Sequence, residues 1–177
     1  MTQGAVRYST SETVDFVVVG SGAAGGVLAK ELSSNGFSVV VLEQGPYLRA
    51  PDFRHDELES YAGDGLIGSL RDHPHSWRAR DDEPATPAKL FPSVFYAKAV
   101  GGSSLHFAAN YWRFRPVDFH ERSLLGAIPG ATLEDWPLTY DELEPYYTKV
   151  DWEVGVSGEP GPGEPRRSRP YPVPPMP

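Results

Sequence analysis

The stretch VDFVVVGSGAAGGVLAKELSSNGFSVVVLEQG, residues 14–45, decides the fold of this chain. Residues 14–19 form an apolar, β-branched run, which is typical of a buried parallel strand. Residues 23–34 carry apolar side chains at helical spacing, and the Asn-Gly pair that follows favours a left-handed helix end. A second β-branched run covers residues 37–42. The stretch therefore predicts one strand–helix–strand unit of an α/β, Rossmann-like fold.

A glycine pattern, GxGxxG, lies between the first predicted strand and the helix. Gly20 makes the tight turn, Gly22 lets the backbone approach a pyrophosphate, and Gly25 lets the helix pack closely on the strand. Ala23 and Ala24 open the helix, whose first N–H groups and positive dipole end favour an anion. The pattern therefore predicts a dinucleotide site, and a glycine-rich packing turn is the alternative.

Glu43 ends the second predicted strand, about 20 residues after the glycines, where an acidic side chain accepts hydrogen bonds from a ribose. A carboxylate repels the 2′-phosphate of NADP, so NADP is disfavoured. This first motif leaves FAD and NAD both open.

A second glycine turn with hydroxyl side chains follows in AVGGSSLHFAANYWRFRPVDF, residues 99–119. With this element the chain resembles the glucose–methanol–choline (GMC) oxidoreductases. These flavoproteins have an N-terminal FAD fingerprint and a later Gly-Gly-Ser/Thr-Ser/Thr element that packs on the flavin. The resemblance extends through WPLTYDELEPYYTKVDWEVGVSG and RRSRPYPVPP, so it covers nearly the whole chain. Those stretches look most like the gluconate and sugar dehydrogenase flavoproteins.

The resemblance implies FAD as the cofactor. The residues it places at the FAD are Gly20, Gly22, Gly25, Glu43, Gly101, Gly102, Ser103, Ser104 and His106. Ala23 and Ala24 at the start of the predicted helix, and Asn110, are further candidates for cofactor contacts.

The chain departs from the family pattern at Leu105-His106-Phe107, because many members have an asparagine there. The arrangement is similar to pyranose oxidases, in which the matching histidine carries a covalent flavin. His106 is therefore expected either to bond the flavin covalently or to lie hydrogen-bonded beside its ring. Asn110 is expected to contact the flavin ring or to be a surface amide.

Other polar residues are expected to have structural roles. Arg113 and Arg115 could pair locally with Asp118. His73 and His75 lack further ligands nearby, so a solvated loop is favoured over a metal site, and no metal ligands are predicted. The tryptophans expected to pack are Trp112, Trp136 and Trp152.

The chain is predicted to have three parts. Residues 1–13 form a polar arm, and residues 14–158 form the N-terminal part of an FAD-binding domain. A long stretch without periodicity, residues 46–92, is expected to be an irregular flavin-covering loop. Residues 159–177 hold eight prolines and are expected to lead, extended, to a missing substrate domain.

The region before the proline-rich segment is predicted to be helical. Thr139 and Glu142 have the spacing of a capping box. Pro145 is disfavoured deep inside a helix, so a second helix is expected to begin there and run to about Glu153.

Composition excludes several classes of protein. The formal net charge of −8 argues against nucleic-acid binding and against attraction to anionic lipid. There is no cysteine, so no disulfide or thiolate chemistry is available. No stretch is long and apolar enough for a membrane span, and residues 1–13 lack a signal-peptide pattern, which favours a cytoplasmic location.

The resemblance implies oxidation of a hydroxyl group on a sugar, sugar acid or related alcohol, by hydride transfer to flavin N5. The family's catalytic base is a histidine far downstream, and no histidine follows His120 here. We therefore expect the N-terminal portion of such an enzyme, without its base, incomplete as a domain and marginally stable. Its expected partners are the substrate and a complementary C-terminal chain or an electron-acceptor subunit.

Two other functions stay open. The chain could be a non-catalytic dinucleotide-binding fragment or half of a two-chain flavoenzyme, inactive alone. A NAD-dependent Rossmann dehydrogenase is disfavoured by the second glycine turn and by the lack of a regular βαβ succession after Gly45.

Overall fold

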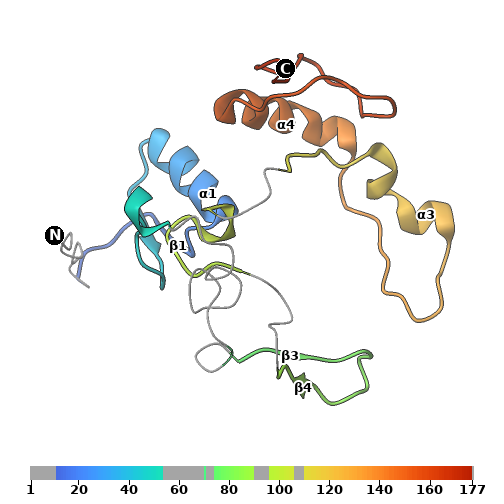
Figure 1. The fold of residues 1–177 in the computed structure, drawn as a ribbon, viewed down its shortest axis with the longest axis horizontal. Helices are drawn as coiled ribbons and strands as arrows, with labels where there is room; N and C mark the ends of the chain where they lie inside the picture. Colours follow the sequence, from blue (N-terminus) through green and yellow to red (C-terminus); the bar gives the residue numbers. More distant parts are fainter. Residues whose placement is uncertain (1–10, 54–69, 71–73, 90–95, 106–109, 177) are drawn as a thin grey trace. The chain divides into compact units, whose positions relative to one another are not determined.

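The computed structural model describes residues 11–53, 70, 74–89, 96–105 and 110–176. The chain divides into two compact units, Met1–Ala108 and Ala109–Pro177. Figure 1 shows the elements of each unit in the colours of the sequence.

The first unit contains the predicted strand–helix–strand arrangement. Strand β1, Phe16–Val19, pairs in parallel with β2, Val39–Leu42, and helix α1, Ala23–Ser34, connects them. The helix ends at Ser34 with Asn35 as its C-cap, and Gly36 follows with φ of +89°. The prediction of this unit and of its helix end is confirmed, because the apolar periodicity and the Asn-Gly pair both act locally.

The prediction that the first strand is buried is wrong for the described residues. Val17 is 57% exposed and Val19 is 84% exposed. Val27 and Leu28 of α1 are about half exposed as well. Two strands and one helix cannot cover both faces of a sheet, so apolar side chains stay in contact with solvent.

The other described elements of the first unit are short. Two 3₁₀ helices, η1 at Ala50–Asp52 and η2 at Gly102–Leu105, flank a small antiparallel hairpin. Its strands are β3, Ser76–Trp77, and β4, Thr86–Pro87. The stretch without sequence periodicity therefore contains this one two-stranded pairing among its described residues.

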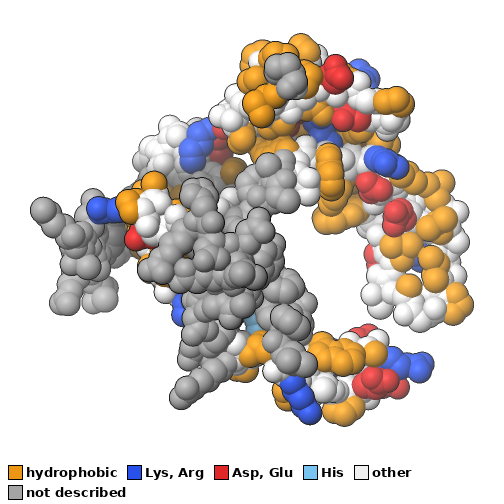
Figure 2. Space-filling model, viewed as in Figure 1, with side chains coloured by type: hydrophobic (Ala, Val, Ile, Leu, Met, Phe, Trp, Pro, Cys, Tyr) orange, Lys and Arg blue, Asp and Glu red, His pale blue; other side chains and the backbone are white. Residues whose placement is uncertain are grey.

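The second unit is built around helix α4, Tyr140–Val154, with the 3₁₀ helix η3, Pro116–Phe119, and the short helix α3, Glu121–Leu125. Phe119 is 1% exposed and lies in a cluster of aromatic rings with Phe114, Trp136 and Tyr140. Phe119 and Tyr140 are the buried rings of this aromatic cluster, whereas Phe114 and Trp136 are about half exposed. The surface around α3 carries exposed hydrophobic side chains (Figure 2).

The predicted capping box is confirmed, whereas the predicted helix break at Pro145 is wrong. Thr139 Oγ1 accepts a hydrogen bond from the Glu142 N–H at 3.3 Å, and Glu142 Oε2 accepts one from the Thr139 N–H at 2.8 Å. The helix then continues without a break through Pro145 to Val154. Buried side chains on both sides of the proline bind one arginine, Arg113, which holds the two halves in a single helix.

The proline-rich segment packs along α4. Its Arg166 carbonyl accepts a hydrogen bond from the Tyr140 hydroxyl at 2.8 Å, and the Ser168 N–H donates to Glu144 at 2.9 Å. Ser157 and Val173 form an isolated parallel bridge. Among the described helices, none has the length and apolar character needed to cross a membrane.

Candidate dinucleotide-binding site

The first glycine turn joins β1 to α1 with the geometry that the sequence predicts. Gly20 has φ of +88°, which favours glycine, and Gly22 is the N-cap residue directly before α1. A Cβ atom at Gly25 would overlap the carbonyl oxygen of Gly20 and lie 3.3 Å from Val18 Cγ1. Gly25 therefore lets the helix pack closely against the end of the strand.

Open space lies in front of the other two glycines of the turn. A Cβ atom at Gly20 or Gly22 would meet no atom of another described residue within 4 Å, chain neighbours aside. Ala23 and Ala24 follow as the first residues of α1, and their side chains are exposed. The N-terminus of the helix is thus open to an anionic group that approaches the backbone.

Glu43 follows β2 directly and turns its carboxylate towards the glycine turn. Its Oε2 accepts hydrogen bonds from the Ser21 N–H at 2.9 Å and from the Ser21 hydroxyl at 2.7 Å. Its Oε1 accepts one from the Gly45 N–H at 2.8 Å. The Ser21 hydroxyl and then the Gly45 and Ser21 N–H groups lower the pKa of Glu43 to about 2, so the carboxylate is ionised at neutral pH.

The second glycine turn contacts the first. Gly101 and Gly102 have φ of +97° and +60°, and the Gly101 N–H donates to the Ser21 hydroxyl oxygen at 3.0 Å. A Cβ atom at Gly102 would lie 2.9 Å from Gly22 Cα, so glycine permits this approach. The two motifs, 80 residues apart at this hydrogen bond, therefore form one site.

Sequence reasoning missed Ser21, which occupies a variable position of the GxGxxG pattern. A hydroxyl between two glycines, with an acidic residue 22 positions on, is a weak signal. Only the contact with Gly101 reveals what the side chain does.

A cavity of about 600 Å³ opens between the two turns. Its walls include residues of both glycine turns, the end of β2 and the segment just before Gly101. The lining residues are Val19, Gly20, Ser21, Gly22, Leu42, Glu43, Gln44, Ala97, Lys98, Ala99 and Gly102. The predicted residues Gly20, Gly22, Glu43 and Gly102 therefore share one cavity.

Four other predicted site residues are not among those that line this cavity. Ser103 Oγ accepts a hydrogen bond from the Ala97 N–H at 3.0 Å, so it closes its own turn, and Ser104 is exposed. His106 lies outside the described residues. Asn110 belongs to the second unit, where it lines a separate cavity with Tyr111. The roles of these four residues at a flavin stay predictions.

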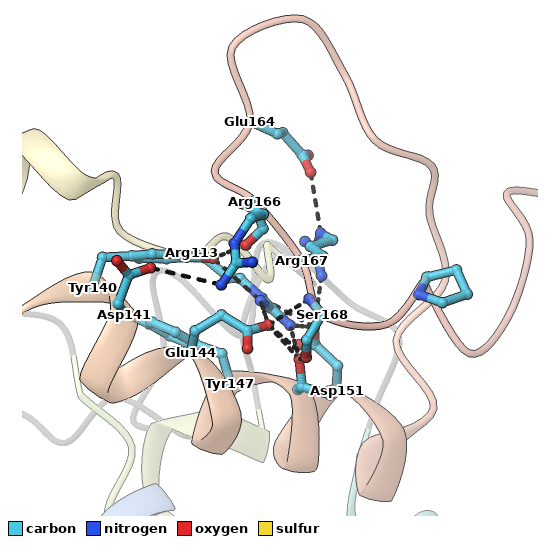
Figure 3. A network of polar contacts seen from close by, with 12 residues as sticks. Arg113, Tyr140, Asp141, Glu144, Tyr147, Asp151, Glu164, Arg166, Arg167 and Ser168 are labelled. Carbon is cyan, nitrogen blue, oxygen red and sulfur yellow. Dashed lines mark hydrogen bonds and ion pairs between the residues drawn. The ribbon is translucent and has the colours of Figure 1, made fainter.

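The second unit holds a buried ionic network that sequence reasoning also missed (Figure 3). The prediction that Arg113 pairs locally with Asp118 is wrong. Arg113 pairs instead with Glu144 at 3.1 Å and with Asp151 at 2.6 Å, and all three side chains are almost fully buried. Asp118 accepts a hydrogen bond from the Arg115 backbone N–H. The long sequence separation explains the error, because no local pattern indicates which carboxylates an arginine will reach.

The network extends to the proline-rich segment. Arg167 Nη1 also binds Asp151, at 2.6 Å, and the Ser168 N–H and hydroxyl bind Glu144. Burial would raise the pKa of Glu144, but hydrogen bonds from Thr148, Ser168 and Arg113 outweigh it and lower the pKa to about 2. The carboxylates are therefore paired on two sides, by Arg113 and by the proline-rich segment.

The predicted aromatic and histidine roles have mixed outcomes. Trp136 contacts the rings of the aromatic cluster although it is about half exposed, and the Trp152 ring lies under the Arg169 guanidinium at 3.5 Å. Trp112 is 81% exposed, so its prediction as a packing residue is wrong for the described structure. His75 stacks on Tyr96, and His73 lies outside the described residues.

The chain is similar to known dehydrogenases. Residues 18–81 match the profile described as an NAD(P)-binding Rossmann-like domain. The chain is 34% identical to 2-methyl-1,2-propanediol dehydrogenase of Mycolicibacterium austroafricanum, over 85% of this chain and 26% of that protein. It is 32% identical to the fructose dehydrogenase large subunit of Gluconobacter japonicus, over 93% and 32% of the two chains. It is also 32% identical to the gluconate 2-dehydrogenase flavoprotein of Pantoea cypripedii, over 88% and 27%.

The chain's homologues are GMC oxidoreductases, and it matches their N-terminal part. The chain spans about a quarter to a third of the length of the curated relatives that it matches. Among solved structures, pyridoxine 4-oxidase from Mesorbium loti is 26% identical, with a TM-score of 0.49, over 92% of this chain and 28% of that protein.

Proposed function

We propose that this chain binds FAD and forms the cofactor-binding part of an enzyme that oxidises a hydroxyl group on a sugar, sugar acid or related alcohol. The observation that carries the proposal is the joined pair of glycine turns around one cavity, with ionised Glu43 at its edge. When bound, FAD would supply the acceptor for the hydride that leaves the carbinol carbon.

The residues present fit such a cofactor. Open space in front of Gly20 and Gly22 leaves room for a pyrophosphate at the N-terminus of α1. Glu43 is ionised and uses three hydrogen-bond positions, so its carboxylate keeps acceptor capacity for a ribose hydroxyl. The same charge disfavours the 2′-phosphate of NADP.

The second turn favours FAD over NAD in this proposal. Gly101 and Gly102 bring a second stretch of backbone to the cavity, beyond the mononucleotide unit of β1, α1 and β2. One curated relative is named a flavoprotein, which supports the same choice. We propose that Gly101 to Ser104 lie towards the flavin end of the cofactor, with His106 and Asn110 near its ring.

The substrate class rests on the relatives. Their names include a propanediol, fructose and gluconate dehydrogenase, so each is named for a compound that carries hydroxyl groups. Two of those names describe a subunit or a flavoprotein component. We propose that the electrons pass to a partner subunit or small acceptor, and that the residue that removes the hydroxyl proton lies in the matching part of a longer or second chain.

The test is cofactor retention by the full 177-residue chain. The protein is expressed, mixed separately with FAD, NAD and NADP, and desalted, and its absorption spectrum and bound nucleotide are measured. Retained flavin with no retained NAD or NADP is the expected result. Retention of NAD without FAD overturns the proposal in favour of a nicotinamide-dependent enzyme, and retention of none of the three overturns nucleotide binding by this chain.

A further inference from the structure

The hydroxyl of Ser21 lies between the two glycine turns and makes a hydrogen bond to each side. It donates to Glu43 Oε2 at 2.7 Å and accepts from the Gly101 N–H at 3.0 Å. The direction of both bonds is fixed by chemistry. An ionised carboxylate only accepts, so the hydroxyl proton points to Glu43 and a lone pair of the oxygen faces Gly101.

The two sides differ in how much they depend on this hydroxyl. Without it, Glu43 keeps two backbone donors, the Ser21 N–H at 2.9 Å and the Gly45 N–H at 2.8 Å. The acceptor that the described structure offers to the Gly101 N–H is the Ser21 hydroxyl. Loss of the hydroxyl therefore leaves the carboxylate in place but removes the acceptor of the Gly101 N–H, while the Val100 N–H still donates to the Pro46 carbonyl at 3.0 Å.

Close backbone packing makes the position of the second turn sensitive to this bond. Gly102 approaches so near to Gly22 that an added Cβ atom would lie 2.9 Å from Gly22 Cα. Gly22 and Gly102 both line the cavity of about 600 Å³. A small displacement of the second turn thus changes the shape of this cavity.

We propose that Ser21 is a positioning residue that couples the ribose-binding carboxylate to the flavin-side glycine turn. This inference rests on the proposed function and adds the residue that joins its two halves. Ser21 acts through Glu43 and Gly101 and need not touch the cofactor itself. Its hydroxyl matters for a ligand that occupies both turns and matters little for a ligand that occupies only the first.

The experiment compares two ligands, ADP and FAD, on the full chain. Dissociation constants are measured by calorimetry for the unmodified protein and for Ser21→Ala, Ser21→Thr and Ser33→Ala. Ser33 is the matched control, because its hydroxyl bonds only locally, to the Lys30 carbonyl near the far end of α1. Amide hydrogen exchange at Gly101 is measured by NMR on the same proteins without ligand.

The proposal predicts that Ser21→Ala weakens FAD binding about 10-fold or more and ADP binding less than about 3-fold. Exchange at the Gly101 amide is expected to become faster in Ser21→Ala. Ser21→Thr, which keeps the hydroxyl, and Ser33→Ala are expected to resemble the unmodified protein in both measurements.

Other binding or exchange results would overturn the positioning role of Ser21, the hydrogen bond behind it, or the proposed function. Equal losses for ADP and FAD in Ser21→Ala, or no loss for either, overturn the positioning role while FAD binding by the unmodified chain stands. Unchanged exchange at Gly101 overturns the hydrogen bond on which the role depends. If the unmodified chain binds ADP but no FAD, or neither ligand, the proposed function fails and the positioning role fails with it.

Discussion

Arg113 and Asp151, 38 residues apart in the sequence, are joined by two hydrogen bonds to one carboxylate oxygen. Arg113 Nε lies 3.1 Å and Nη2 lies 2.6 Å from Asp151 Oδ2. Arg113 also donates to Tyr140, Glu144 and Thr148. These partners share one face of α4, so a single side chain ties the loop before η3 to about three turns of helix.

Replacement of Arg113 by alanine is expected to destabilise the second unit by about 3–5 kcal/mol. The substitution removes the cation that pairs with buried Glu144 and leaves Asp151 with Arg167 alone, and a buried charge without its partner is costly. Urea unfolding followed by tryptophan fluorescence measures the change. The control is Arg166→Ala, because Arg166 and Asp141 form an exposed ion pair at 4.0 Å, which contributes little. Equal effects of the two substitutions would contradict the role of the buried network.

Removal of the α4 capping hydroxyl is expected to cost about 1 kcal/mol of unfolding free energy. Thr139→Ala leaves the Glu142 N–H without its side-chain acceptor. Thr139→Ser keeps the hydroxyl and is expected to retain most of the stability. Thr132, an exposed threonine outside the helices, provides the control Thr132→Ala. A cost for Thr139→Ser as large as that for Thr139→Ala would argue against capping.

The substitution Pro145→Ala is expected to stabilise the chain by about 1–3 kcal/mol. Proline lacks the N–H that would donate to the Asp141 carbonyl, and alanine restores this donor inside the continuous helix. Pro145 is exposed, so the smaller side chain leaves no buried cavity. Thermal unfolding followed by circular dichroism measures the change. A lower melting temperature would show that the proline ring makes contacts that outweigh the missing hydrogen bond.

Acid is expected to destabilise the second unit through Glu144. The pKa of Glu144 is lowered from 4.5 to about 2 in the folded chain, so the folded state favours the ionised carboxylate. The stabilisation is therefore complete at pH values above the unfolded pKa, falls as the pH drops below about 4.5, and is lost near pH 2. Urea unfolding is measured at a series of pH values in this range. Glu144→Gln cannot titrate, so its free energy of unfolding is expected to depend less steeply on pH than that of the unmodified chain; parallel curves would contradict this assignment.

Flavin bound to the chain is expected to be released on acid precipitation. Of the two hypotheses for His106, a histidine hydrogen-bonded beside the flavin ring is favoured over a covalent bond. The reconstituted protein is precipitated with trichloroacetic acid and the flavin in the supernatant is measured. Flavin that stays in the pellet, and is absent from the pellet of His106→Ala, would establish the covalent bond instead.

The parts of the fold that sequence reasoning predicted correctly depend on neighbours in the chain. The helix Ala23–Ser34 is marked by apolar spacing and by the Asn-Gly pair at its end. The capping box of α4 involves residues three positions apart. Pro145 was misjudged because the cost of a missing hydrogen bond is local, while the compensating bonds to Arg113 come from a distant segment.

In the candidate site, too, the sequence predicts the residues of a local motif but not the contact between distant segments. The GxGxxG spacing and Glu43 predict half of a nucleotide site, because each glycine and the acidic residue has a defined role in the dinucleotide-binding motif. The link from Ser21 to Gly101 depends on how a later turn folds back on the first. A serine in a variable position of the motif carries no pattern that would predict this bond.

By itself, the sequence determined the strand–helix–strand unit, the glycine turn and the acidic residue at its edge, because backbone preferences and side-chain periodicity act over a few residues. Only the tertiary structure decided that Ser21 joins the two glycine turns and that Arg113 binds one face of α4. These bonds join groups about 30 to 80 residues apart. The physical reason is that a hydrogen bond or ion pair requires close approach in space, and the packing of the chain sets that approach.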